Sequence, residues 1–321
     1  MTLESGTKAP ILSVKDLKKH YELRRFLKPS NFVKALDGVS FSLGHKRTLA
    51  VVGESGCGKS TLAKVLIQIE PLTSGEVRIA DREMSQTPRS EFIKNIQMIF
   101  QDPYSSINPR KKAWQIISEP LMINSKLSQA ECKGVALEMM AKVGLRPEFG
   151  NRYPHMFSGG QRQRIGIARA LILKPQVMIC DEPVSALDVS IQAQVINLLI
   201  DLQDQFGLSY VFISHDLSVV RHLADEVLVM YLGKVVEYGA REKIFAHPKH
   251  PYTQALLASA PHFKSTTGVD NVTLKGELPS PLNPPSGCPL HRRCPFAMAK
   301  CETIVPELKD VEGRLVSCHL Y

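Results

Sequence analysis

Residues 53–61 read Gly53-Glu54-Ser55-Gly56-Cys57-Gly58-Lys59-Ser60-Thr61. An apolar run suited to a β-strand, Thr48 to Val52, precedes this stretch, and an amphipathic helical pattern, Ser60 to Ile67, follows it. Between a strand and a helix, glycines let consecutive backbone N–H groups face a triphosphate, Lys59 reaches the outer phosphates, and the Ser60 hydroxyl can bind Mg²⁺. The stretch therefore predicts a nucleotide-binding phosphate loop.

A second element supports the same prediction. Residues 177–182 form an apolar, strand-like run that ends in two acids, Asp181 and Glu182. Ligands of an open parallel sheet bind at the carboxyl ends of its strands, so we expect both acids beside the phosphate loop. Asp181 can hold Mg²⁺ directly or through water, and Glu182 can polarise the water that attacks the γ-phosphate.

The third motif is Phe157-Ser158-Gly159-Gly160-Gln161, which precedes a helical pattern over 164–171. Ser158 is a good N-cap, and the two glycines leave N–H groups uncovered at a helix start, which makes a second anion site. Here the chain resembles the ATP-binding cassette family, whose signature motif usually has Leu in place of Phe157. The resemblance implies a head-to-tail dimer, in which each ATP lies between one subunit's phosphate loop and the other subunit's signature motif.

Four further matches follow from the resemblance. Gln101, after the apolar run 96–100, resembles the glutamine that senses Mg²⁺ and the attacking water, and His215 resembles the histidine that contacts the γ-phosphate. Ser185-Ala186-Leu187-Asp188 resembles the loop that crosses the dimer interface, and Tyr21 resembles the aromatic that stacks on adenine. Each match also has an ordinary interpretation when taken singly: Gln101 as a polar loop residue, His215 as a loop histidine, Asp188 as a helix cap and Tyr21 as a packing aromatic. The resemblance implies catalytic roles for Glu182, His215 and Gln101, Mg²⁺ contacts from Ser60, Gln101 and Asp181, and ATP contacts from Tyr21, Gly53, Glu54, Ser55, Gly56, Cys57, Gly58, Lys59, Ser60, Thr61, Asp181, Ser158, Gly159, Gly160, Gln161 and Asp188.

Length and composition agree with an ATPase subunit that has no membrane span. No apolar run in the 321 residues approaches the roughly 20 needed to cross a bilayer, and Met1 to Pro10 contains no apolar core of a secretory signal. Cys57, Cys132 and Cys180 stand singly, which favours a reducing compartment. The net charge of +9 admits nucleic acid or an anionic membrane as a neighbour, but the basic residues are spread along the chain.

Alternation of strand-like and helix-like segments over 11–104 and 156–246 predicts a layered α/β fold, that of a P-loop NTPase. Helical patterns over 114–124 and 128–144 lie between them, the second opening with the capping-box residues Ser128 and Glu131. The resemblance implies an ABC ATPase domain over 1–260, with a helical subdomain over about 105–157 that carries the signature motif. It also implies that Tyr104 to Arg110 contacts membrane partners.

The C-terminal residues 261–321 carry a proline-rich linker and a Cys-rich extension. With His250-Pro251-Tyr252-Thr253 before it, this region resembles the ATPases of dipeptide and oligopeptide permeases, in particular their F-type ATP-binding subunits. The proline-rich linker predicts that the extension forms a layer separate from the phosphate loop.

Cys288, Cys294, Cys301 and Cys318 can bring four thiolates around one centre. In the peptide-permease ATPases the matching cysteines bind a [4Fe–4S] cluster, so the resemblance implies one here. A Cys₄ zinc site stays open, although its ligands more often come in pairs with shorter gaps than these. Unligated thiols or disulfides stay open as well.

The resemblance implies an ATP-hydrolysing subunit that powers peptide import and is peripheral to the cytoplasmic face of a bacterial inner membrane. Its expected partners are a second cassette ATPase, two integral membrane permease subunits and, indirectly, a periplasmic or extracellular substrate-binding protein. We expect a D-type ATPase partner in a heterodimer, with a homodimer as the alternative. Nickel, haem and δ-aminolevulinate remain alternative cargoes. An ATPase acting on nucleic acid or ribosomes is less favoured because no heptad insert or internal repeat is visible, and Glu182 and His215 argue against a hydrolytically dead regulator.

Overall fold

A computed structural model describes residues 9–25, 28–102, 104–259 and 272–321. The chain forms two compact units. The first contains Gly44–Arg47 and Ile79–Val211 with the residues up to Ile11, and the second contains Leu12–Leu43, Thr48–Arg78 and Phe212–Tyr321. Both combine helices with strands, so the predicted α/β class is confirmed.

The second unit is organised around strand β3 (Thr48–Val52), in which all five residues are buried. It pairs in parallel with β9 (Glu226–Tyr231), placing Leu49 opposite Glu226. A strand buried on both faces is expected to be a continuous apolar run, and residues 48–52 have that pattern. Antiparallel strands extend this sheet from β9, in the order β10 (Lys234–Ala240), β12 (Leu315–Val316) and β11 (Lys309–Asp310).

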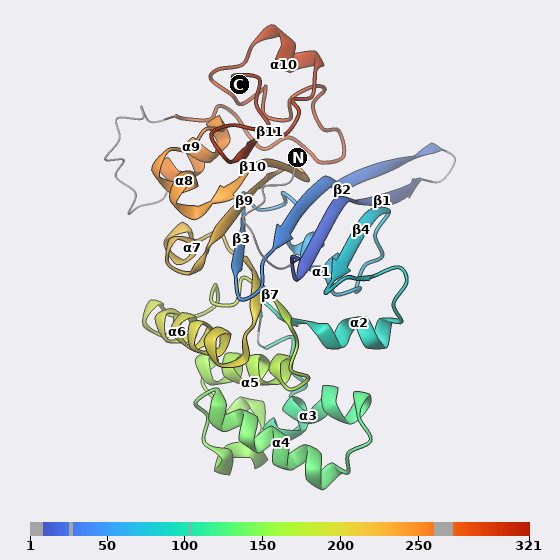
Figure 1. Cartoon of the computed structure of the whole chain (residues 1–321), viewed down its shortest axis with the longest axis vertical. Coiled ribbons are helices and arrows are strands. Elements are labelled where there is room, and N and C mark those ends of the chain that lie inside the picture. Colours follow the sequence, from blue (N-terminus) through green and yellow to red (C-terminus); the bar gives the residue numbers. More distant parts are fainter. Residues whose placement is uncertain (1–8, 26–27, 103, 260–271) are drawn as a thin grey trace. The chain divides into compact units, whose positions relative to one another are not determined.

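A long antiparallel pair also belongs to the second unit. It consists of β1 (Leu12–Arg25) and β2 (Lys28–Leu43), with Leu12 opposite Leu43, and β4 (Ser74–Ile79) follows β1 in the same sheet (Figure 1). Apolar side chains at the base of the pair, Leu17 and Val39 among them, are fully buried.

The helices of the second unit pack beside its sheets, and α1 directly follows the predicted phosphate loop. They are α1 (Lys59–Leu66), α7 (Leu217–Leu223), α8 (Arg241–Ala246), α9 (Pro251–Ala258) and α10 (Ala299–Thr303).

The C-terminal segment, residues 272–321, shares one hydrophobic core with the β3–β9 sheet. Leu290, Cys288 and Cys301 pack in the same cluster as Val52, Val229 and Tyr252. Figure 1 shows this segment, in red, beside β10. The prediction of a separate layer was therefore wrong, because the linker returns the chain to the sheet and places apolar side chains in its core.

In the first unit, β6 (Ile96–Ile99) pairs in parallel with β7 (Val177–Asp181), with Ile96 opposite Val177. Strand β8 (Ser209–Ile213) begins in this unit and ends in the second. The remaining elements here are β5 (Arg82–Glu83), α2 (Arg89–Asn95), α5 (Gly159–Leu171) and α6 (Val189–Phe206).

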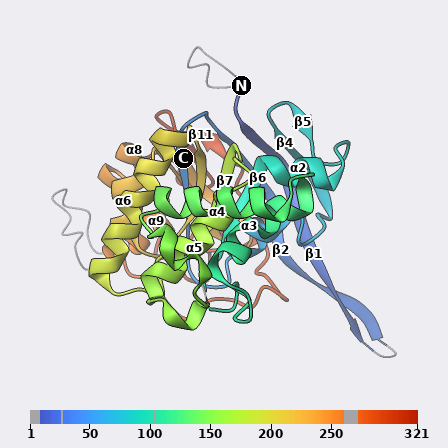
Figure 2. The ribbon, with the colours of Figure 1, turned by 90° about the horizontal axis from the view of Figure 1, so that it is seen from below.

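The predicted helices between β6 and β7 are confirmed as α3 (Ala113–Asn124) and α4 (Gln129–Lys142). Ser128 caps α4 as predicted, because its hydroxyl accepts the Glu131 N–H while the Glu131 carboxylate accepts the Ser128 N–H. Helices α3, α4 and α5 pack against one another (Figure 2), and two short 3₁₀ turns connect α4 to α5, Pro147–Asn151 and Pro154–Met156.

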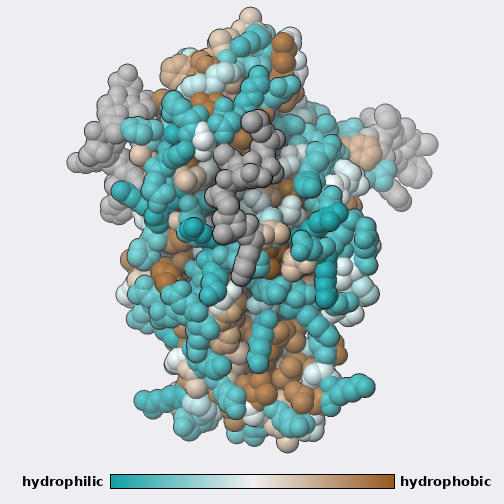
Figure 3. Space-filling view, viewed as in Figure 1, coloured by the Kyte–Doolittle hydropathy of each residue, from teal (hydrophilic) through white to brown (hydrophobic). Residues whose placement is uncertain are grey.

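The surface of α3 and α4 is partly apolar. Ile123 is 75% exposed, and Met122 and Leu127 are also exposed. Figure 3 shows hydrophobic side chains among hydrophilic ones in the region of these helices. Large exposed apolar groups in one region are typical of contact surfaces.

Candidate nucleotide site

The phosphate loop joins β3 to α1, as predicted. Gly53 and Gly58 have φ angles of 153° and 107°. A Cβ atom on Gly53 would lie 2.3 Å from the Met230 carbonyl oxygen, and one on Gly58 would lie 2.3 Å from the Ala35 carbonyl oxygen. These contacts are with backbone, so they cannot be relieved by a side-chain rotation. Both glycines are therefore required by the path of the loop.

Lys59 lies inside the loop and is buried. Its ammonium donates to the carbonyl oxygens of Gly53, at 2.7 Å, and of Glu54, at 3.0 Å. Both acceptors are neutral carbonyls, so these two hydrogen bonds do not pair the ammonium with a carboxylate. The geometry fits the predicted role of Lys59 toward the outer phosphates, with Ser60 beside it in the first turn of α1.

We expect Gly58→Ala to lower the free energy of unfolding by about 2 kcal/mol, because it combines a left-handed backbone with a backbone clash. Thermal or urea unfolding measures the loss. Gly134→Ala is the matched control: Gly134 lies within α4, its added Cβ meets nothing within 4 Å, and we expect no destabilisation. Equal free energies of unfolding for the two variants would contradict the conclusion that the loop requires glycine at position 58.

Two residues that sequence reasoning missed hold Glu54 within this unit. The Tyr252 hydroxyl accepts the Glu54 N–H at 2.7 Å, and Arg293 donates to the Glu54 carboxylate at 2.8 Å. Tyr252 belongs to the His-Pro-Tyr-Thr stretch that marked the family resemblance, so the stretch itself was a signal, but its contact with the loop was not readable from the sequence. Burial raises the pKa of Tyr252, which keeps its hydroxyl neutral.

In the first unit, the acidic pair lies at the carboxyl end of β7. Asp181 is buried as the last residue of the strand. Glu182 leaves the strand with a φ of 45°. This backbone conformation is unfavourable for a non-glycine residue, and such conformations are concentrated at functional sites. The predicted strand over 177–182 therefore ends one residue early, because Glu182 turns.

Glu182 and Gln101 come together in this unit. The Gln101 side-chain amide donates to the Glu182 carboxylate at 2.9 Å. Two residues predicted from different motifs, separated by 81 positions, thus share one hydrogen bond at the end of the β6–β7 pair. A carboxylate with an oriented amide donor can hold a water molecule in a defined direction.

The signature motif starts α5 as predicted. The Ser158 hydroxyl accepts the Gln161 N–H at 3.3 Å, and the Gln161 side chain accepts the Ser158 N–H at 3.0 Å. The Gln161 side chain thus serves the helix cap itself. Phe157, the departure from the family motif, is buried with an edge-to-face contact to Phe149, so its ring fills the core below the motif.

Asp188 stands at the start of α6, close to this motif. It is the N-cap residue but makes no side-chain capping bond, and it is exposed. A Cβ on Gly160 would lie 2.6 Å from Ile191 of α6, so the small residue allows the starts of α5 and α6 to approach each other.

His215 and Tyr21 belong to the second unit. His215 follows β8 and is exposed, while the next residue, Asp216, caps α7 through the N–H groups of Ser218 and Val219. Tyr21 lies in β1 opposite Val33, and the Lys19 ammonium is 4.7 Å from its ring centroid. The ring can stack on a base, and Lys19 would add positive charge beside it.

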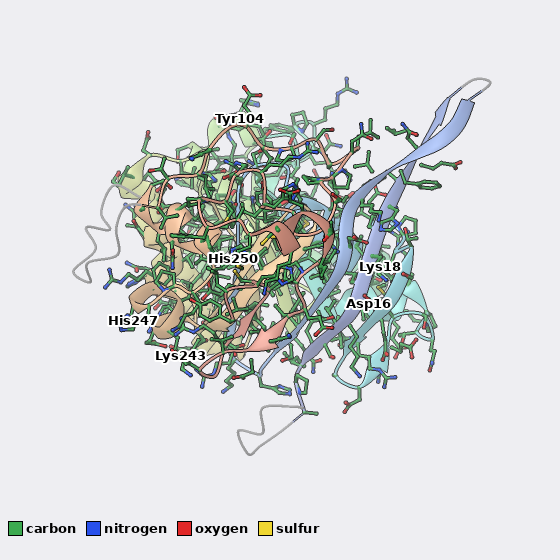
Figure 4. All side chains as sticks on the ribbon, turned by 90° about the horizontal axis from the view of Figure 1, so that it is seen from above. Asp16, Lys18, Tyr104, Lys243, His247 and His250 are labelled. Carbon is green, nitrogen blue, oxygen red and sulfur yellow. The ribbon has the colours of Figure 1, made fainter. Side chains whose placement is uncertain are left out.

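The four C-terminal cysteines line one small cavity in the second unit. Cys288 and Cys301 are buried, Cys294 and Cys318 are half-buried, and all four are free thiols. Burial raises the pKa of Cys288 to about 11 and also raises the pKa values of Cys294 and Cys318. His250, labelled in Figure 4, also lines the cavity, and burial lowers its pKa to about 3.

The cavity does not have the geometry of a single-ion site. Within the described part of the chain, no three His, Cys, Asp or Glu side chains are placed to hold one metal ion. A zinc ion in a Cys₄ site is held by four sulfurs about 2.3 Å from one centre.

Comparisons with known proteins show the family of the chain. Residues 36–185 match the ABC transporter family, and residues 236–301 match the family "Oligopeptide/dipeptide transporter, C-terminal region". The dipeptide transport ATP-binding protein DppF of Escherichia coli (strain K12) is 55% identical, over 99% of this chain and 96% of that protein. The oligopeptide transport ATP-binding protein AppF of Bacillus subtilis (strain 168) is 50% identical, over 99% of this chain and 100% of that protein.

Among solved structures, the ATP-binding cassette MJ0796, a dimer bound to ADP and Pi in a post-hydrolysis state, has a TM-score of 0.62. It is 27% identical, over 72% of this chain and 98% of that one. The chain therefore belongs to the ABC transporter family of ATP-binding proteins. Its high-identity relatives within that family are peptide transport ATP-binding proteins.

Proposed function

We propose that this chain is the ATP-hydrolysing subunit of an importer for dipeptides or oligopeptides. The observation that carries the proposal is the joint presence of a complete phosphate loop and a C-terminal region that matches the oligopeptide and dipeptide transporter family. Family membership implies ATP and Mg²⁺ as cofactors. The names of the relatives favour peptides over nickel, haem or δ-aminolevulinate as cargo, and over nucleic acid as a target.

In this proposal the phosphate loop and Lys59 bind the triphosphate, and Ser60, Asp181 and Gln101 hold Mg²⁺. Glu182 orients the attacking water with Gln101, a role supported by their hydrogen bond. His215 contacts the γ-phosphate. Tyr21 stacks on adenine, while the signature residues 158–161 and Asp188 act across a dimer interface.

The proposed assembly contains a second cassette ATPase, preferably a D-type subunit in a heterodimer, and two integral membrane permeases. The dimeric state of MJ0796 supports pairing of two ATPase heads. The described residues include no helix that is long and apolar enough to span a membrane. We therefore propose peripheral attachment to the cytoplasmic face of the inner membrane, with permeases that receive peptide from an external binding protein.

The proposed contact with the permeases lies near Tyr104 to Arg110. Tyr104 is 63% exposed, and the Arg162 guanidinium lies 4.0 Å from its ring centroid. This contact joins the exposed loop to the first helical turns of α5, which carry the signature motif. A movement of this loop caused by a membrane partner would therefore be transmitted to the proposed nucleotide contacts at the start of α5.

Affinity purification of the tagged full chain from membranes tests the assembly. We expect two integral membrane proteins and a second cassette ATPase, with ATP hydrolysis by the purified complex stimulated by peptide and its binding protein. Copurification of ribosomal RNA or DNA without membrane proteins would contradict the proposal.

We further propose the domain limits as 1–260 for the ABC ATPase domain, with a helical subdomain over about 105–157, and 261–321 for the linker and Cys-rich extension. Helices α3 and α4 and the two 3₁₀ turns support the subdomain. The matched transporter region begins earlier, at residue 236, and the C-terminal segment shares its core with the β3–β9 sheet. The extension is thus a separate region of the sequence, but in the structure its side chains belong to the core of the second unit.

We also propose that Cys288, Cys294, Cys301 and Cys318 hold a [4Fe–4S] cluster rather than zinc. Support comes from their place around one cavity and from their free thiols. Thiolates are the usual ligands of such clusters, and a bound group would offset the cost of ionising thiols whose pKa values burial raises. Such a group would be structural.

We expect protein purified without oxygen to contain about four irons per chain and to absorb broadly near 400 nm. Cys294→Ser should remove most of the iron, because it deletes one of four ligands. Cys132→Ser is the control: Cys132 lies in α4 of the first unit, and iron content should not change. One zinc per chain, or metal-free protein from an anaerobic preparation, would contradict the cluster.

A further inference from the structure

Glu54, the second residue of the phosphate loop, forms an ion pair with Arg293 of the C-terminal segment. The Arg293 guanidinium donates to the Glu54 carboxylate at 2.8 Å, and their side chains are 11% and 30% exposed. The two residues are 239 positions apart but belong to the same compact unit. The Arg293 side chain is largely covered, whereas the Glu54 side chain stays partly exposed.

The guanidinium also lies beside an aromatic pair. It lies 5.8 Å from the ring centroid of Tyr231 and 3.4 Å from the Tyr231 hydroxyl. The Tyr231 ring packs on the Tyr252 ring with centroids 4.8 Å apart, and Tyr252 accepts the Glu54 N–H. One aromatic pair and one arginine thus hold both the backbone and the carboxylate of Glu54.

The backbone at Arg293 is equally well held. Its N–H donates to the Leu290 carbonyl oxygen at 2.8 Å, and Leu290 is buried in the core shared with β3 and β9. The next residue, Cys294, lines the cysteine cavity. The fold of the C-terminal segment therefore determines where the Arg293 charge lies.

The chemistry of the loop explains why that charge matters. A carboxylate on a loop that binds a triphosphate repels the ligand, and the repulsion is strong where protein excludes water. Arg293 cancels this charge and limits the positions that the loop can adopt. Ser55 and Gly56, the next residues, are exposed and can turn their N–H groups to an anion.

We propose that Arg293 is a positioning residue for nucleotide binding: it holds and neutralises Glu54 so that the loop accepts the triphosphate. The inference rests on the proposed role of the loop. It makes the C-terminal segment part of the nucleotide site of its own unit. Arg293 itself need not touch ATP.

The test measures the affinity of the full chain for a fluorescent ATP analogue with Mg²⁺. We expect Arg293→Gln to weaken binding about tenfold at low salt, while turnover of the assembled complex at saturating ATP changes less than about twofold. The loss of affinity should shrink at high salt, because salt screens the repulsion between Glu54 and the phosphates.

Arg292→Gln is the matched control, because Arg292 is the exposed neighbour and the substitution removes the same charge. Its affinity should equal that of the wild type. Arg293→Lys should retain most of the affinity, since it keeps the charge. The double variant Glu54→Gln/Arg293→Gln should recover binding to within about threefold of the wild type, because the unpaired carboxylate is gone.

The outcomes separate this inference from the proposed function. If Arg293→Gln binds like Arg292→Gln, or if the double variant binds as weakly as Arg293→Gln at every salt concentration, the positioning role is overturned. The function is tested separately by Lys59→Ala, and normal binding by that variant would overturn the role of the loop. Unfolding midpoints of all variants show whether a loss of affinity follows from unfolding.

Discussion

We expect Glu182→Gln to reduce ATP turnover by about 10²-fold or more while ATP binding is retained. Glu182 stands at the end of β7 with a left-handed backbone, and its carboxylate accepts the Gln101 amide at 2.9 Å. Glutamine has nearly the same shape and keeps an oxygen for that hydrogen bond. The substitution therefore removes the negative charge that would polarise water and leaves the surrounding geometry in place.

The measurement is steady-state hydrolysis by the assembled transporter, together with nucleotide binding by the same preparation. Glu138→Gln is the control, because Glu138 is an exposed residue of α4 and the charge change is identical. Turnover by Glu182→Gln within about threefold of this control would refute the proposed role. A loss of binding together with turnover would instead place Glu182 in nucleotide binding.

We expect Lys59→Ala to weaken ATP binding by about 10²-fold or more. The Lys59 ammonium is buried and held by the Gly53 and Glu54 carbonyl oxygens, so its charge is preorganised inside the loop. Charge-assisted contacts to phosphate are among the strongest that a side chain makes. Removing the ammonium leaves the loop with backbone N–H groups and the start of α1 as its only proposed phosphate donors.

Titration with a fluorescent ATP analogue measures this loss. Lys64→Ala serves as the control, because Lys64 is exposed on the same helix and its removal changes net charge equally. Comparable affinities of the two variants would contradict the assignment of the loop. A thermal unfolding scan of Lys59→Ala should show that the fold is retained.

Local features of the fold were predictable because each depends on residues close together in the chain. The strand 48–52, the helix after the phosphate loop and the caps at Ser128 and Ser158 were all confirmed. Burial on both faces imposes a continuous apolar run, and capping needs residues only three positions apart. Motif order also led to the family, which the comparisons confirm.

Some features of the site resisted prediction. The left-handed turn at Glu182 shortened the expected strand, since no glycine marks that turn in the sequence. In the sequence, Phe157 is only a departure from the family motif. The structure shows that its ring is buried against Phe149. The linker suggested a detached extension, but composition carries no information about where the chain packs after a linker.

By itself, the sequence predicted the phosphate loop at residues 53–61, the two acids that end the apolar run 177–182, and the four cysteines available to a shared centre. Only the tertiary structure decided what holds the loop. Tyr252 and Arg293 reach Glu54 across 198 and 239 positions because α9 and the C-terminal segment both pack into the core of the β3–β9 sheet. Contacts at such separations depend on how buried surfaces fit together, and no local pattern of residues records that fit.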